Sequence, residues 1–164
     1  MSDATVPPDE VLLELGRLVW AALSLEDVAY PFCRCVKPRH GPFDDVPIGT
    51  RIDEALKDLE ERPDDELRRR AHAWLVETKA ALEDRNHVVH GIPGVFVRIS
   101  GDSPPPPGGI WLTRFSRKGR GDIVNTQAEV ASLETIRRRL EAAYLGSEMR
   151  SDLWETRPDS AEQS

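Results

Sequence analysis

Residues 67–91 carry the clearest helical pattern of the chain, and they read LRRRAHAWLVETKAALEDRNHVVHG. Apolar and small side chains recur there at steps of three and four residues, which places them on one face of a helix. That face comprises Leu67, Ala71, Trp74, Leu75, Thr78, Leu82, Arg85 and Val89. Gly91 suits the position that follows a helix end, and Pro93 cannot continue a helix. The stretch therefore predicts a long amphipathic helix that ends near His90.

Two more helices are expected before this one. The first begins at Asp9, which is placed to cap it, and Pro31 is expected to kink or end it. The second is shorter, has Thr50 or Asp53 as its cap, and is broken at residues 62–65. The apolar stripe of the first helix is Val11, Leu12, Leu15, Leu18, Val19, Ala22, Ala29 and Phe32, with Glu26 on the same stripe. The second helix uses Ile52, Leu56 and Leu59.

The helical period gives way to alternation in the middle of the chain. Residues 95–99 and 110–115 alternate apolar and polar side chains, and Ile123 and Val124 add a third short segment of this kind, so strands are predicted. The sequence from Thr126 to Glu129 matches a capping box, which predicts the start of a last helix. Its apolar positions are Val130, Leu133, Ile136, Leu140 and Tyr144.

These elements predict a mainly helical fold. We expect a bundle of four to five helices with a small antiparallel β hairpin or meander inserted before the last long helix. Residues 9–146 form the single domain, residues 1–8 a disordered leader, and residues 147–164 a polar, partly disordered tail.

Composition narrows the class of protein. The chain has 164 residues and a formal net charge of -7, which argues against a polyanion-binding surface over the whole protein but allows a local basic site. Its longest apolar run, residues 18–23, is too short to cross a membrane, and its acidic start lacks a secretory signal. Cys33 and Cys35 are too close for an ordinary disulfide. A cytoplasmic protein that does not enter a membrane is therefore expected.

The chemically informative segment is the end of the third helix. Arg85 lies on the apolar stripe, where an unpaired charge is costly, and Asn86 and His90 lie close to it along the helix. A guanidinium suits phosphate, and a histidine can move protons near neutral pH. The same residues also admit a structural interpretation. Arg85 would then pair with Glu26, and His90 would cap the helix end.

Arg85-Asn86-x-x-x-His90 resembles the R-x(4–6)-H motif of the HEPN superfamily, in which a polar residue such as Asn often follows the arginine. The helical setting of the motif is similar too. The resemblance implies a HEPN-like bundle and a metal-independent endoribonuclease with no cofactor. Such enzymes often act as toxins of toxin–antitoxin systems or as phage-defence effectors. Ile92 stands where one HEPN subgroup has the tyrosine that a nucleotidyltransferase antitoxin modifies. Other members of the superfamily are non-catalytic dimerisation or partner-binding modules, which is the alternative function.

The implied mechanism requires two copies of the chain. Attack by the ribose 2′-hydroxyl needs a base for its proton and an acid for the leaving 5′-oxygen, and one histidine does not easily do both in one step. A homodimer supplies two copies of His90 and Arg85, while Asn86 orients the phosphate or the imidazole. The expected partners are thus a second copy, an RNA substrate, and an antitoxin or nucleotidyltransferase.

Two further groups of residues could bind ligands. Arg114, Arg117, Lys118 and Arg120 form a basic hairpin tip that could follow RNA phosphates, although such a run is often a solvated turn. His87 and His90 could share a metal with Cys33 and Cys35, but no zinc-binding pattern is present and no metal is expected. Residues 137–139, three consecutive arginines, are expected to be a solvated face paired with Glu134 and Glu141.

Overall fold

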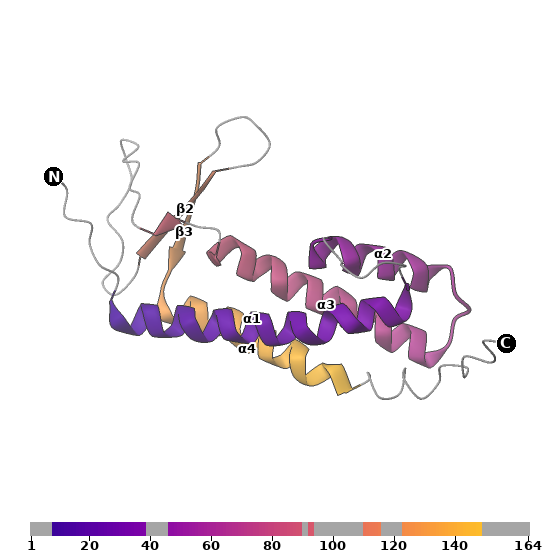
Figure 1. Ribbon diagram of the computed structural model, residues 1–164. Helices are drawn as coiled ribbons and strands as arrows, with labels where there is room; N and C mark the ends of the chain where they lie inside the picture. The colour runs from indigo at the N-terminus through magenta and orange to yellow at the C-terminus, as the bar shows by residue number, and fades with distance from the viewer. Residues whose placement is uncertain (1–7, 39–45, 90–91, 94–109, 116–122, 149–164) are drawn as a thin grey trace.

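The described part of the chain is mainly helical, as predicted (Figure 1). The computed structural model describes residues 8–38, 46–89, 92–93, 110–115 and 123–148. Over these residues it has helices α1 (Asp9–Val36), α2 (Ile48–Glu60), α3 (Glu66–Val89) and α4 (Val130–Leu145), followed by a single 3₁₀ turn, η1 (Gly146–Glu148). It also has strands β1 (Ile92–Pro93), β2 (Ile110–Phe115) and β3 (Ile123–Ala128), which form an antiparallel sheet in that order.

Helix α1 organises the bundle, since it packs against each of the other helices. Helix α4 runs beside it in the same direction, and α3 runs the opposite way (Figure 1). Helix α2 covers α1 and α3 at one end, while β2 and β3 lie at the other end, where α3 finishes (Figure 1). The end of α3, on which Arg85 and Asn86 lie, is therefore the end nearest the sheet (Figure 1).

Trp74 of α3 connects three helices within the hydrophobic core. Its ring packs against Phe32 of α1 at a centroid distance of 4.6 Å, and its Nε1 donates a 2.8 Å hydrogen bond to the carbonyl of Ala143 in α4. Both contacts are buried, so one side chain joins three helices. The fully buried aliphatic side chains of the core include Leu18, Leu25, Leu75, Leu133 and Leu140.

The helix boundaries depart from several predictions. Pro31 does not end α1. The helix continues to Val36 because Phe32, Cys33 and Val36 are buried in the core. The predicted caps of α1 and α2 are also wrong, since Pro8 and Pro47 precede those helices in place of Asp9 and of Thr50 or Asp53. Both prolines have the extended conformation that suits a helix start.

The predicted capping box at the start of α4 is wrong, because its first residue belongs to a strand. Thr126 belongs to β3, whose pairing with β2 runs to Ala128, so the helix begins only at Val130 without a side-chain cap. By contrast, the break between α2 and α3 is where the sequence predicts it. Asp65 caps α3 by accepting a 2.7 Å hydrogen bond from the backbone N–H of Arg68.

The predicted apolar stripes are mostly buried, with a few exposed exceptions. Leu12 and Val19 of α1, Val89 of α3 and Tyr144 of α4 are exposed, whereas Val88 and Ala143, the neighbours of two of them, are buried. The predicted strand at residues 95–99, the residues 1–7 of the predicted leader and all but Ser147 and Glu148 of the predicted tail lie outside the described residues. No helix in the described ranges combines the length and apolar composition needed to cross a membrane.

Candidate active site

Arg85 and Glu26 form an ion pair between α3 and α1, as the sequence predicts. A terminal guanidinium nitrogen of Arg85 donates to a carboxylate oxygen of Glu26. The side chains are 15% and 22% exposed, so the pair lies at the edge of the core and can still be reached from solvent. Two charges on facing helix stripes are thus brought together, which removes the cost that each would have alone.

Arg85 retains unused hydrogen-bond donors in this position. A guanidinium carries five N–H groups, and Glu26 is the one acceptor recorded for Arg85 within the described residues. Its Nε is buried and has no hydrogen-bond partner there. Burial lowers the pKa of Arg85, but an arginine starts from so high a value that it stays charged. The site therefore presents spare N–H donors on a guanidinium whose charge is paired with that of Glu26.

Of the other two motif residues, Asn86 lies within the described structure and His90 lies outside it. Asn86 follows Arg85 in the same helix and is half-buried. His87 is exposed, one turn beyond Glu83. His90 lies directly after the last residue of α3 and outside the described residues, so its predicted proximity to Arg85 rests on the sequence.

The other predicted ligand-binding residues are not brought to this site by anything in the described structure. Arg114 lies in β2, and Arg117, Lys118 and Arg120 fall in the range 116–122, which is outside the described residues. Where the structure does describe the chain, no three side chains of a metal-binding type come together. Cys33 is buried in the core of α1, and Cys35 is half-buried.

Glu14 of α1 and Arg137 of α4 form a second interhelical ion pair, which the sequence analysis does not predict. Arg137 Nε donates to Glu14 Oε1 at 2.5 Å, and its NH1 nitrogen binds Glu141 at 2.7 Å. Glu14 is 6% exposed and Arg137 18%, so the prediction of a wholly solvated arginine face is wrong for Arg137. The sequence does indicate that Glu14 is buried, because it lies three residues after Val11 and four before Leu18 on the buried stripe of α1.

This pair makes stability depend on pH. Burial raises the pKa of Glu14, but the hydrogen bond and charge of Arg137, with a smaller contribution from Arg17, outweigh it and hold that pKa below its ordinary value of 4.5. Because the folded-state pKa is lowered, the stabilisation is present above about pH 4.5 and is lost as the pH falls through the folded-state value.

Replacing Arg137 with Met is expected to lower the free energy of unfolding by about 2 kcal/mol at pH 7. The loss is smaller than for a fully buried pair because Arg137 lies at the rim, yet Glu14 would keep only its 3.4 Å contact with Arg17. The matched control is Arg138→Met, since Arg138 is 71% exposed and should change little. Urea unfolding of both variants measures the difference, which should shrink below pH 4. Equal losses in the two variants would contradict the account.

Comparison of the chain with models of protein families, with curated proteins and with solved structures finds no match. The site must therefore be interpreted from its own residues.

Proposed function

We propose that the protein is a metal-independent endoribonuclease of the HEPN type, with the β strands as an insertion in a HEPN-like bundle. The observation that carries the proposal is the placement of Arg85. It is held at the edge of the core by Glu26, with donors left over, at the helix end that leads directly into His90. An arginine fixed in this way is suited to hold a phosphate while a nearby histidine moves a proton.

The chemistry follows from the residue types. The 2′-hydroxyl of the ribose attacks the adjacent phosphorus, and the bond from phosphorus to the 5′-oxygen breaks. One His90 accepts the proton of the 2′-hydroxyl, and the His90 of a second copy gives a proton to the leaving 5′-oxygen. Arg85 neutralises the charge that builds up on the phosphate oxygens, and Asn86 orients the phosphate or an imidazole. Each step uses side chains of this chain alone.

The alternative is a non-catalytic HEPN-like module that dimerises or binds a partner. The Arg85–Glu26 pair favours it to the extent that an interhelical ion pair can be purely structural. The two functions differ in one respect that can be measured, because only the enzyme needs His90. RNA contact by Arg114, Arg117, Lys118 and Arg120, and regulation by an antitoxin, remain predictions under either function.

The purified chain should cleave single-stranded RNA in the presence of EDTA. The same sequence made as DNA should stay intact, because it lacks the attacking 2′-hydroxyl. Gel analysis of end-labelled oligonucleotides measures both. RNA left intact with and without added Mg²⁺ would contradict the proposed enzyme and favour the non-catalytic module. Cleavage that appears only with Mg²⁺ would contradict the metal-independent mechanism.

A further inference from the structure

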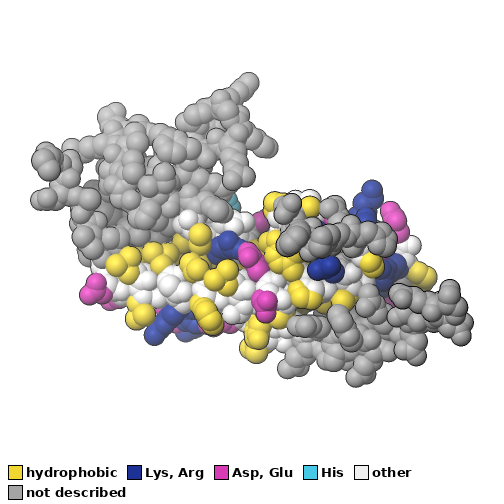
Figure 2. Space-filling view, viewed as in Figure 1, with side chains coloured by type: hydrophobic (Ala, Val, Ile, Leu, Met, Phe, Trp, Pro, Cys, Tyr) yellow, Lys and Arg dark blue, Asp and Glu magenta, His cyan; other side chains and the backbone are white. Residues whose placement is uncertain are grey.

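Helix α1 is apolar on nearly all sides between residues 11 and 25, where Glu14 and Arg17 are the charged residues. A helix with apolar side chains all round is normally covered all round. One side of α1 is the core of the bundle, but the opposite side is open. Figure 2 shows a band of hydrophobic side chains along α1. The exposed members of this outer face are Leu12, Leu13, Val19, Trp20 and Leu23.

Gly16 lies at the middle of this face. A glycine inside a helix destabilises it relative to alanine, so it usually marks a place where something must approach closely. Among the described residues nothing does so, because a Cβ built on Gly16 meets no atom within 4 Å. Gly146 differs, since a Cβ there would come within 3.2 Å of the Trp74 ring. The helix surface at Gly16 therefore leaves room for another chain to approach closely.

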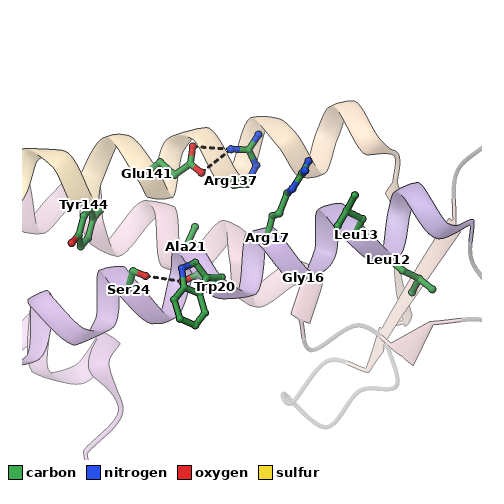
Figure 3. A pocket seen from close by; sticks show the side chains of 10 residues that line it. All are labelled: Leu12, Leu13, Gly16, Arg17, Trp20, Ala21, Ser24, Arg137, Glu141 and Tyr144. Carbon is green, nitrogen blue, oxygen red and sulfur yellow. Dashed lines mark hydrogen bonds and ion pairs between the residues drawn. The ribbon is translucent and has the colours of Figure 1, made fainter.

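A groove of about 840 Å³ runs along the same face between α1 and α4 (Figure 3). Leu13 and Gly16 line its α1 wall, and Tyr144 reaches toward α1 from α4 (Figure 3). Trp20 stands at its edge with 74% of its surface exposed. An exposed tryptophan beside an open apolar groove is an arrangement typical of the centre of a protein–protein interface.

We infer that a second copy of this chain covers the outer face of α1, with the two α1 helices crossing at Gly16. The face is its own complement, because bulky side chains stand one turn before Gly16, at Leu12 and Leu13, and one turn after it, at Val19 and Trp20. Trp20 lies about 6 Å along the helix from the crossing point, so its indole can reach the groove of the other copy. The Trp20 of each copy would thus enter the groove of the other, as a two-fold dimer requires.

The charges of the face fit a second copy as well. Arg17 is its one exposed charge between residues 11 and 25, and it lies 3.4 Å from Glu14 of the same helix. Glu141, across the groove, is bound by Arg137. The face thus has little net charge with which to select a partner of opposite sign, and two identical faces can meet without strong repulsion.

The link between this dimer and catalysis rests on the proposed function. Glu26 lies ten residues from Gly16, which is about 15 Å along the helix. The two Arg85–Glu26 pairs can approach each other only if the crossing helices run in broadly the same direction. The interface itself does not depend on that direction.

The test is the mass of the full chain in solution, measured by sedimentation equilibrium over a range of micromolar concentrations. We expect a dimer for the wild type and at least a 10-fold weaker dimer for Trp20→Ala and for Gly16→Leu. Gly16→Leu should keep its helical circular dichroism, because leucine favours a helix and a Cβ at this position meets no neighbour within 4 Å. Val76→Ala, which truncates an exposed apolar side chain on α3, is the matched control and should dimerise normally.

A monomeric wild type would overturn the inference, and so would variants that dimerise as tightly as the wild type. A wild type that forms a complex only with a different protein would overturn it too. RNA cleavage is followed separately on the same samples. A dimer that leaves RNA intact contradicts the proposed function alone, whereas a monomer that cleaves RNA contradicts both the dimer and the two-histidine mechanism.

Discussion

Replacing His90 with Ala is expected to lower the rate of RNA cleavage by about 10³-fold. The proposed reaction uses His90 twice, once in each copy, so the substitution removes both the base and the acid. Arg85 remains in the variant and can still hold a phosphate, so RNA binding should be almost unchanged. Single-turnover cleavage in EDTA measures the rate, and fluorescence anisotropy with a 2′-deoxy oligonucleotide measures the binding.

His87→Ala is the matched control for this experiment. His87 lies three residues earlier, is exposed in the last turn of α3, and has no part in the proposed reaction. The His87→Ala variant should therefore cleave RNA at close to the wild-type rate. If His90→Ala also keeps that rate, the observed cleavage comes from another site or from a contaminating nuclease.

Replacing Trp74 with Ala is expected to lower the free energy of unfolding by about 4 kcal/mol, a large fraction of the stability of a small domain. The substitution removes the packing against Phe32 and leaves the Ala143 carbonyl without its donor. Both losses fall at the point where α1, α3 and α4 meet, and a cavity there cannot easily collapse. Urea unfolding followed by circular dichroism measures the change.

Two related variants separate the loss of ring packing from the loss of the hydrogen bond, and the buried tryptophan from an exposed one. Trp74→Phe keeps an aromatic ring against Phe32 but lacks the indole N–H, so it should lose less stability than Trp74→Ala. Trp20→Ala removes the same side chain from a position that is 74% exposed, and should leave the stability of a single copy nearly unchanged. If Trp74→Ala unfolds at the same urea concentration as Trp20→Ala, the contacts of Trp74 with α1 and α4 do not stabilise the fold.

Helical periodicity predicts the positions of the helices well, because the residues that repeat at the helical period are the ones that each helix buries in the core. Thr78, Leu82 and their neighbours on the stripe of α3 are buried as expected. The same reasoning predicts the Arg85–Glu26 pair, because two charges on facing apolar stripes are both costly unless they meet. Glu14 also lies on a buried stripe, but its partner Arg137 is not on the predicted apolar stripe of α4, so the same reasoning does not identify that pair.

Helix ends are less predictable because their local signals compete with tertiary contacts. Pro31 is a strong local signal, but burial of Phe32 and Val36 outweighs it. Thr126 has the sequence of a cap, yet strand pairing occupies its backbone. Exposure of Leu12 and Val19 is not visible in the sequence either, since an apolar pattern does not show which faces of a helix its neighbours cover.

The ends of the RNA fragments test the central claim most directly. RNA is cleaved in EDTA and the fragments are analysed by mass spectrometry. Attack by the 2′-hydroxyl, with Arg85 and His90 as the acting residues, predicts a 2′,3′-cyclic phosphate on one fragment and a 5′-hydroxyl on the other, both lost in His90→Ala. Fragments that end in a 3′-hydroxyl and a 5′-phosphate would contradict this mechanism, because water and not the ribose would then be the nucleophile.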